Sequence, residues 1–439
     1  MRNPYVTGAY VTGRKYYGRK EMLDYLLHGV SSSYWVVGNR RIGKTSLLRQ
    51  LEHLALAEGQ LAPLYWDMQG CDTFKGLGQY LADAVQDHRE RFEALGLSRA
   101  ELSDENALTL LARLRRAAAR ADRELLLLCD ETEVLIKIAM RAPRSMQRLH
   151  RELTGGGGLR VVATSTRAIY QLHDVCSDWP TSPFLAGFDM SQTLGSLTPH
   201  SARALIVQAQ EPEDGRVQAA PDVVETISDY TNNHAYLIQL LCSRLFQPEG
   251  RLRPVTEDDL EVDPLLKGFF RIDFNALTDA DHQIVWAAHR ANVIDEAALH
   301  KLLGGDPADL HRRLHNLERL GYLRRVYGQI ATGNQFLADW LNAERDAVDA
   351  IPAAPTSETA MQTALRRQQS QEQSFLVTRL NRQRARLVEL EAIRARDLLD
   401  VSPQVLAEIE QTQTEIRHMR RLLDEMHDSF PETPSFREI

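Results

Sequence analysis

The sequence lacks several features that would define a particular class of protein. It has only four cysteines, Cys71, Cys129, Cys176 and Cys242, and none of them forms a C-x-x-C pair, so we expect buried thiols and neither a disulfide framework nor a zinc site. No run of 18 apolar residues occurs, which predicts no transmembrane helix. The N-terminal MRNPYVTG lacks the apolar run of a signal peptide. We therefore expect a cytoplasmic protein without a membrane partner.

Charge of one sign is also not in large excess. The 439 residues carry a net charge of −8, with 43% hydrophobic and 26% charged residues, which is typical of globular proteins. The length predicts about three domains of ~150 residues. A net acidic chain gives no indication of obligate nucleic-acid binding, although a local basic face remains open. Nucleophile elbows, HExxH motifs and metal-ligand clusters are absent, which leaves phosphate chemistry as the enzymatic signal.

The main motif lies in residues 34–50, which read YWVVGNRRIGKTSLLRQ. The apolar run 34–37 predicts a buried strand, the next nine residues fit G-x-x-x-x-G-K-[ST], and a helical pattern follows. This order is the context that a phosphate-binding P-loop requires, with backbone N–H groups and a helix N-terminus facing phosphate oxygens. Lys44 is expected to reach the β- and γ-phosphates of ATP, and Thr45 to bind Mg²⁺. The predicted nucleotide-binding residues of the loop are Gly38, Asn39, Arg40, Arg41, Ile42, Gly43, Lys44, Thr45 and Ser46.

Two carboxylates follow a second buried strand. Residues 124–134 read ELLLLCDETEV, with Asp130 and Glu131 after the apolar run. Ligands bind at the carboxyl edge of open α/β sheets, so we expect Asp130 to hold the Mg²⁺ shell and Glu131 to orient and polarise the attacking water. The alternative is that both acids only cap the next helix. The P-loop upstream favours the catalytic interpretation.

Further strands are expected at residues 61–69, 159–165 and 190–197, and helices at 21–27, 74–95 and 107–121. The strand at 159–165 is followed by Arg167, and its polar tip makes Thr164, Ser165 and Arg167 candidate sensors of the γ-phosphate. A solvated arginine at a strand exit is the alternative. The predicted fold class is an α/β P-loop NTPase with a parallel sheet of the ASCE/AAA-like kind, over residues 1–200.

Two smaller units are predicted next. Residues 201–270 have the pattern of a helical lid, in which His234 lies at a helix start and either faces phosphate or only caps the helix. Residues 271–345 predict three helices and a hairpin, which is the order of a winged helix-turn-helix. Its candidate DNA contacts are the arginines Arg312, Arg313, Arg319, Arg324 and Arg325. Packing or protein interaction is the alternative role of this unit.

The C-terminal part differs in composition. Residues 346–360 include the Pro/Ala/Ser/Thr-rich DAIPAAPTSET and predict a linker. Residues 361–428 predict a helical hairpin, because apolar residues of its second helix step by 4 and 3 as in a coiled coil. This hairpin is expected to pair with itself, a second copy or a partner. Residues 429–439 are expected to be disordered.

The motif order resembles AAA-like P-loop ATPases of the STAND class, the signal-transduction ATPases with numerous domains. The resemblance covers about residues 1–345. Its most specific segments are NPYV at 3–6 with YGRKE at 17–21, and NNHAYLIQLLC at 232–242. It also includes GNRRIGKTS, LLLLCDE, VVATSTR at 161–167 and LTPHSARALI at 197–206. Asn233 and Ala235 depart from the family, which usually has glycine and proline there.

This resemblance implies roles that the residues alone do not. Tyr17, Gly18 and Arg19 would touch adenine or its ribose, Arg167 would act as the first sensor, and His234 would approach the β-phosphate. Arg148 and Arg151 are candidates for acting in trans on a neighbouring subunit. The cofactors implied are ATP and Mg²⁺.

The leading hypothesis is therefore a slow, switch-like ATPase that changes conformation or forms a homo-oligomer with ATP. Many bacterial members of the class that it resembles are antiviral proteins with a fused effector. This chain has no recognisable effector enzyme, so it would recruit a separately encoded effector protein through its C-terminal hairpin. A DNA-binding ATPase of the initiator, transposition or regulatory type is the alternative. A nucleotide-stabilised scaffold without turnover is a third hypothesis.

Overall fold

The computed structural model describes residues 1–102, 106–155, 157–176, 184, 187–349 and 409. The chain divides into two compact units, Met1–Asp346 and Ala347–Ile439. The predicted hairpin and tail lie outside the described residues, apart from Ile409. All further description concerns the first unit. In the described part of the chain, no helix is long and apolar enough to cross a lipid bilayer.

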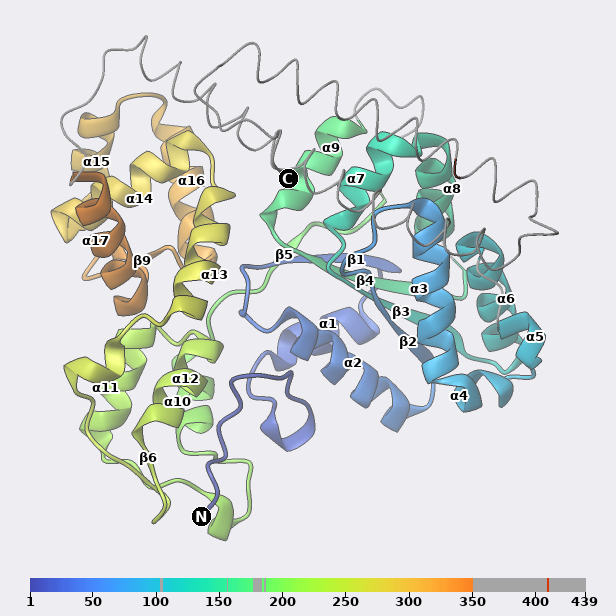
Figure 1. Cartoon of the computed structure of the whole chain (residues 1–439), viewed down its shortest axis with the longest axis horizontal. Coiled ribbons are helices and arrows are strands. Elements are labelled where there is room, and N and C mark those ends of the chain that lie inside the picture. Colours follow the sequence, from blue (N-terminus) through green and yellow to red (C-terminus); the bar gives the residue numbers. More distant parts are fainter. Residues whose placement is uncertain (103–105, 156, 177–183, 185–186, 350–408, 410–439) are drawn as a thin grey trace. The chain divides into compact units, whose positions relative to one another are not determined.

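A five-stranded parallel sheet with the order β2-β3-β4-β1-β5 forms the centre of the α/β part (Figure 1). The strands are β1 (Ser33–Val37), β2 (Leu61–Asp67), β3 (Glu124–Asp130), β4 (Leu159–Ser165) and β5 (Gln192–Thr193). Almost every side chain of β1, β3 and β4 is buried, because helices cover both faces, as in other parallel sheets. The parallel α/β fold predicted from the apolar runs is confirmed.

The helices lie in two layers around this sheet (Figure 1). One face packs against α1 (Lys20–His28) and α2 (Lys44–Glu58), in a core that includes Leu47 and Leu128. The other face packs against a larger helical layer, in a core that includes Trp66 and Leu127. That layer consists of α3 (Phe74–Asp87), α6 (Ala107–Arg120), α7 (Val134–Arg141), α8 (Pro143–Thr154) and α9 (Tyr170–Val175), with short α4 (Arg89–Glu93) and α5 (Arg99–Leu102) beside it.

Two of the predicted elements were too long. The helix expected at 74–95 is interrupted at His88, where φ is −118° and ψ is 27°, so α3 ends and α4 begins. The strand expected at 190–197 is limited to the two residues of β5. Gly195 lies so close to the next helical part that a Cβ there would be 2.6 Å from the carbonyl oxygen of Arg319.

The elements from α10 to α17, which begin at Pro199, form one helical module. It has a single continuous core, which includes Leu241, Phe274 and Leu314. Its first helices are α10 (Pro199–Ile206), α11 (Pro221–Thr231), α12 (Ala235–Leu245) and α13 (Pro264–Asn275), with β6 (Phe246–Gln247) and β7 (Arg251–Leu252). The later ones are α14 (Asp279–Ala291), α15 (Glu296–Leu303), α16 (Pro307–Arg319) and α17 (Gln335–Asp349), with the sheet β8-β10-β9 formed by Val293–Ile294, Gln329–Thr332 and Leu323–Val326. The three helices and the hairpin expected in residues 271–345 are present. Helices α10 and α13 run across the borders predicted at residues 200 and 270.

Candidate functional site

The P-loop connects β1 to α2 at the carboxyl edge of the sheet. Gly38 N–H donates to Ser165 O at 3.1 Å and so fixes the start of the loop on β4. Gly43 has a φ of +105°, and a Cβ there would be 2.9 Å from Arg19 Nη1. The backbone conformation therefore favours glycine at this position, and a larger residue would also displace the Arg19 guanidinium group. The loop then enters α2 at Lys44.

Lys44 is buried and folded over its own loop. Its Nζ donates to Gly38 O at 3.0 Å and to Asn39 O at 3.2 Å. An ammonium group has three donors, and here two of them are used by carbonyl groups of the loop. Phosphate oxygens placed over the loop would offer this ammonium stronger, charged acceptors.

Asp130, at the end of β3, is 2% exposed and is surrounded by hydroxyl groups. Thr45 Oγ1 donates to its Oδ2 at 2.6 Å, and Tyr65 OH donates to the same oxygen at 2.9 Å. Thr164 Oγ1 donates to Oδ1. The structure therefore brings together the two predicted metal-binding residues, Thr45 and Asp130. A hydroxyl group and a carboxylate in contact at a phosphate loop fit Mg²⁺, which takes one or two protein oxygen ligands besides phosphates and water.

Glu131 follows in a left-handed conformation with φ of 54°, and it lines a cavity. Burial raises the pKa of Glu131 to about 7, and repulsion from Glu133 adds to this rise, while Lys44 opposes it. Glu133 is itself held by Thr166, whose Oγ1 donates at 3.1 Å. The Glu131 carboxyl group is thus poised to take up or release a proton near neutral pH.

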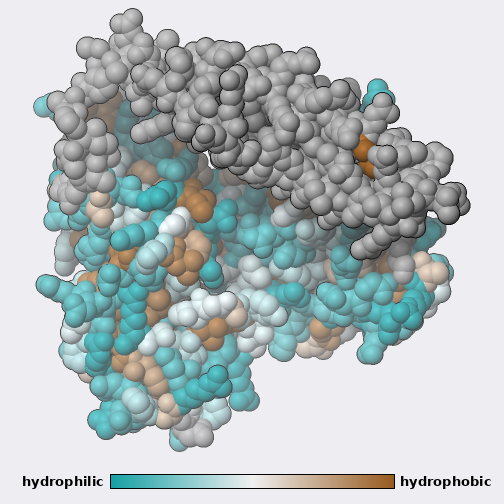
Figure 2. Space-filling view, viewed as in Figure 1, coloured by the Kyte–Doolittle hydropathy of each residue, from teal (hydrophilic) through white to brown (hydrophobic). Residues whose placement is uncertain are grey.

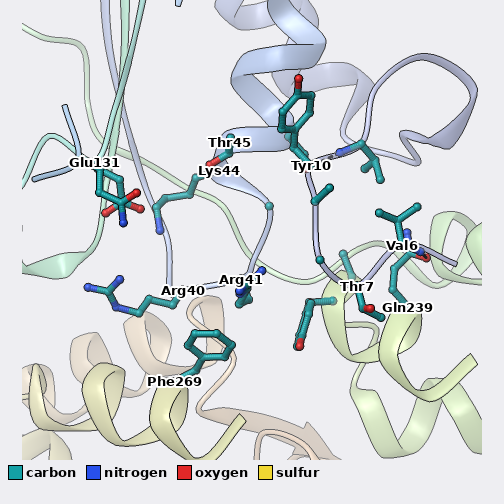
Figure 3. Close-up of a pocket in the computed structure, with 18 residues that line it drawn as sticks. Val6, Thr7, Tyr10, Arg40, Arg41, Lys44, Thr45, Glu131, Gln239 and Phe269 are labelled. Carbon is teal, nitrogen blue, oxygen red and sulfur yellow. Dashed lines mark hydrogen bonds between the residues drawn. The ribbon is translucent and has the colours of Figure 1, made fainter. Parts of the chain in front are cut away.

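The cavity has a volume of about 470 Å³ and lies over the P-loop. Figure 3 shows Arg40, Lys44 and Glu131 toward one end, and Val6, Thr7 and Gln239 toward the other. The charged residues of the first end are Arg40 and Lys44 of the loop itself and Glu131. The opposite end is lined by residues 6–11 and by α12. Val6 N–H donates to Gln239 Oε1 at 3.0 Å and joins these two walls. The cavity therefore has a charged end and a mostly neutral end.

The motif residues Tyr17, Gly18 and Arg19, expected to touch adenine or ribose, do not line this cavity. Tyr17 is buried in the core of the helical module. Arg19 lies behind the loop, where its Nη2 donates to Ile42 O at 2.7 Å and to Gly195 O at 3.1 Å. Arg19 thus braces the P-loop.

His234 caps α12, where its Nδ1 accepts a hydrogen bond from Leu237 N–H at 3.5 Å. Burial, followed by repulsion from Arg19, lowers the pKa of His234 to about 4, so the ring is neutral at pH 7. It lines a second, small cavity with Asn39, Arg40 and Arg41. His234 is therefore close to the loop, but outside the larger cavity.

Arg167 lies at the exit of β4 and points to the helical module. Its Nη1 is 3.2 Å from Asp281 Oδ2, and Asp281 also accepts from Arg313 Nη1 at 3.1 Å. The neighbouring candidates Thr164 and Ser165 are buried; Thr164 contacts Asp130, and Ser165 Oγ accepts from Trp35 Nε1 at 2.8 Å. Of the three sensor candidates, Thr164 is thus in direct contact with the carboxylate centre.

The first half of the P-loop contacts the helical module. Asn39 Nδ2 donates to Leu320 O at 2.9 Å, and Arg40 N–H donates to Asp273 Oδ2 at 2.7 Å. The guanidinium group of Arg41 lies over the Phe269 ring at 4.6 Å. The loop is therefore bonded to the sheet through Gly38 and Thr45, and to the helical module through residues 39 and 40 between them.

The arginines expected to contact DNA mostly have partners within the module. Arg313 contacts Asp281 and Asp309, and Arg312 contacts Asp309. Arg324 donates to Asp229 O at 3.0 Å, and Arg325 lies 2.9 Å from Glu318. Among the described residues, neither Arg319 nor Arg324 forms an ion pair with an acid, and the carbonyl group of Arg319 faces Gly195. Most of these charges would have to exchange a protein partner for a DNA phosphate.

Several residues of the site were not predicted from the sequence. Tyr65 could have been found, because strand pairing places it beside Leu128, two residues before Asp130 and on the same sheet face. Asp273, Gln239 and Phe269 carry no such signal, since they reach the loop only through the packing of the helical module.

Comparison with known proteins finds similarity among solved structures. No family model matches the chain, and no curated protein does. Among solved structures, it is similar to a Walker-type ATPase of Pyrococcus abyssi, with a TM-score of 0.56 and 15% identity over 76% of this chain and 98% of that one. The ORC2 protein of Aeropyrum pernix matches with a TM-score of 0.43 and 15% identity over 77% of this chain and 100% of that one.

The P-loop, the carboxylate strand and the likeness to the Pyrococcus abyssi protein together define a P-loop NTPase fold. The strand β4 separates the P-loop strand β1 from the carboxylate strand β3, so its polar tip lies between the two halves of the site. At 15% identity, the likeness to the Pyrococcus abyssi protein concerns the fold alone.

Proposed function

We propose that this chain is an ATP-binding and hydrolysing STAND-like molecular switch. The observation that carries the proposal is the double attachment of the P-loop. Thr45 joins the loop to Asp130 at 2.6 Å, and Arg40 joins it to Asp273 of the helical module at 2.7 Å. A ligand that rearranges the loop therefore acts on both the chemical centre and the module, which is the requirement for a switch.

In this proposal, the loop residues 38–46 bind the phosphates, with Lys44 releasing its carbonyl partners for phosphate oxygens. Mg²⁺, when bound, neutralises charge on the phosphate oxygens, and Thr45 and Asp130 are the residues that would hold it. Glu131 accepts a proton from water, whose oxygen attacks the terminal phosphorus while the bond to the ADP oxygen breaks. The products are ADP and phosphate.

The other proposed residues act around this centre. The nucleoside lies at the neutral end of the cavity, beside residues 6–11, with Tyr17, Gly18 and Arg19 supporting the arm and the loop. His234 approaches the phosphates from the small cavity beside Arg40 and Arg41. Arg167 reaches the nucleotide only by exchanging Asp281 for a phosphate oxygen.

The proposal includes an ATP-dependent change of conformation or of oligomeric state, and recruitment of an effector through the hairpin at residues 361–428. The STAND resemblance supports these steps, and it is also the support for a role in bacterial antiviral defence. Deletion of residues 357–439 is expected to abolish co-purification of the effector and to leave ATP binding unchanged.

Two variants test the proposal. The wild type is expected to release phosphate from Mg²⁺–ATP and to change its mass distribution with ATP. Lys44→Ala is expected to lose nucleotide binding, whereas Glu131→Gln keeps binding and loses turnover. Equal assembly states of the wild type and Lys44→Ala under all nucleotides would exclude the switch, and turnover that persists in Glu131→Gln would exclude the assigned base. Absence of turnover in the wild type would favour a scaffold.

A DNA-binding ATPase is the second candidate. The order of α14, α15 and α16 followed by the β9–β10 hairpin supports a winged helix-turn-helix. The ion pairs of Arg312, Arg313 and Arg325, and the hydrogen bond of Arg324 to Asp229 O, speak against a free basic face. If these four arginines bind DNA, reversing their charges will abolish a salt-dependent affinity; absence of salt-dependent binding in the wild type excludes the candidate.

A further inference from the structure

The backbone of the P-loop already binds an anionic group of this chain. Arg40 N–H donates to Asp273 Oδ2 at 2.7 Å, and Arg40 Nε lies 3.8 Å from Asp273 Oδ1. The Asp273 side chain is 12% exposed. Backbone N–H groups of such loops are the donors that hold phosphate oxygens in P-loop proteins, so a carboxylate of α13 occupies one donor of a phosphate-binding loop.

Arg40 lies at the charged end of the main cavity, and Asp273 lines the small cavity, which shares Arg40 and Arg41 with the main one. Arg40, Lys44 and Glu131 lie toward that end in Figure 3. Burial raises the pKa of Asp273, Arg40 and Lys44 oppose the rise, and Glu133 adds to it. Asp273 therefore shares one electrostatic environment with Lys44 and with the acids after β3. In the proposed function this is the end that receives the terminal phosphate.

Neighbouring contacts hold α13 against the same half of the loop. Phe269 lies under the guanidinium group of Arg41, and Tyr236 is 5.5 Å from it. Asn39 donates to Leu320 O just beyond α16. Three successive loop residues, 39–41, thus contact the helical module. A change at the Arg40 amide group must alter this docking.

We propose that Asp273 determines discrimination between nucleoside di- and triphosphates: its carboxylate competes with the terminal phosphate for the Arg40 part of the loop, so that a triphosphate displaces α13 and a diphosphate leaves it docked. This inference rests on the proposed nucleotide site and names what that site moves.

The physical basis is repulsion between anions that share one set of donors. A terminal phosphate adds negative charge beside a carboxylate in a partly buried site, where charges interact more strongly than in water. The diphosphate ends before this position and meets less repulsion. A ligand shifts a conformational equilibrium only by its different affinities for the two states, and here the terminal phosphate supplies that difference.

The matched variants are Asp273→Asn and Glu344→Gln. Asparagine keeps the size and the acceptor oxygen of Asp273 and removes its charge. Glu344 pairs with Arg271 of α13 at 3.1 Å on an exposed surface, so its substitution changes the charge next to the same helix without touching the loop. Affinities for ADP and for a non-hydrolysable ATP analogue, both with Mg²⁺, are measured by calorimetry on the full chain.

Asp273→Asn is expected to bind the triphosphate analogue more tightly by on the order of tenfold and ADP by less than about threefold. Glu344→Gln is expected to match the wild type. In hydrogen exchange, the amides of residues 264–275 are expected to exchange faster in the wild type with the triphosphate than with ADP. An equal gain for both nucleotides, or no gain, overturns the inference.

The outcomes separate this inference from the proposed function. If the wild type binds both nucleotides and Asp273→Asn changes neither affinity, the site stands and the competition is refuted. If the wild type and Asp273→Asn bind no nucleotide, both proposals are refuted. Binding of the triphosphate by Asp273→Asn alone establishes the competition in its strongest form.

Discussion

Asp281 offers a direct test of how the α/β part is joined to the helical module. Its carboxylate is 1% exposed and accepts from two arginines, Arg167 Nη1 at 3.2 Å and Arg313 Nη1 at 3.1 Å. Asp281→Asn removes the negative charge at nearly constant volume. Among the described residues, Arg167 then has no ion-pair partner, whereas Arg313 still pairs with Asp309 at 2.7 Å.

The cost can be estimated from these contacts. Removing one partner of a fully buried ion pair costs about 3–5 kcal/mol, because the other charge stays buried and unpaired. The side chains of Arg167 and Arg313 are 21% and 31% exposed, so water can solvate them in part. We therefore expect a loss of about 2–3 kcal/mol in the free energy of unfolding, or a decrease of roughly 3–4 °C in Tm for a unit of this size.

Urea and thermal unfolding of the full chain measure this loss, with Asp309→Asn as the matched control. Asp309 also contacts two arginines, but its side chain is 34% exposed, and exposed pairs contribute about 1 kcal/mol or less. A double-mutant cycle of Asp281→Asn with Arg167→Met isolates the bond to β4. A loss for Asp281→Asn no larger than that of the control, or a coupling energy near zero, would refute the assigned connection.

Three further predictions concern single contacts of the site. Burial raises the pKa of Asp273 from 3.8 to about 6, so the native state holds this proton more tightly than the unfolded chain. The wild type therefore loses up to about 3 kcal/mol of stability as pH rises from 4 to 7, and Asp273→Asn keeps it; urea midpoints across this pH range measure the difference. Gly43→Ala is expected to weaken nucleotide binding more than about tenfold, because φ is +105° and the new Cβ meets Arg19. Tyr65→Phe removes a 2.9 Å hydrogen bond from Asp130 Oδ2 and is expected to raise the Mg²⁺ concentration needed for tight nucleotide binding by about tenfold.

Each of these predictions has its own control. A stability gap between wild type and Asp273→Asn that persists below pH 4 would contradict the linkage to this carboxyl group. Gly59→Ala is the glycine control, since φ is +76° there and no atom lies within 4 Å of the new Cβ. Tyr34→Phe removes another buried hydroxyl, bonded to Arg160 at 3.1 Å. An equal Mg²⁺ requirement in the two tyrosine variants would contradict the role of Tyr65.

The sequence predicts the central sheet well because its strands are buried on both faces. Runs such as ELLLLCD and LRVVATS are apolar without alternation, and β3 and β4 begin and end within or close to the expected ranges. The edge strand β5 is shorter than predicted, and just beyond it Gly195 lies close to Arg319. No local pattern records that contact, which lies more than a hundred residues away in sequence.

The residues of the site also divide into those that local motifs predict and those that long-range packing brings in. Lys44, Thr45, Asp130 and Glu131 belong to motifs whose spacing specifies their meeting at one sheet edge. Asp273 lies 233 positions after Arg40 in the sequence. Surface hydropathy gives no help either, because the described face in Figure 2 is mostly hydrophilic with small, separate apolar patches.

The P-loop itself divides between these two kinds of information. In G-x-x-x-x-G-K-[ST] the specified residues 43–45 line the main cavity and lead to Asp130. The unspecified residues 39–41 contact Leu320, Asp273 and Phe269 of the helical module. Phosphate binding requires residues 43–45. Residues 39–41 can differ between proteins while the loop keeps its phosphate-binding conformation. The positions that the motif leaves open are therefore the ones through which this chain determines what the loop moves.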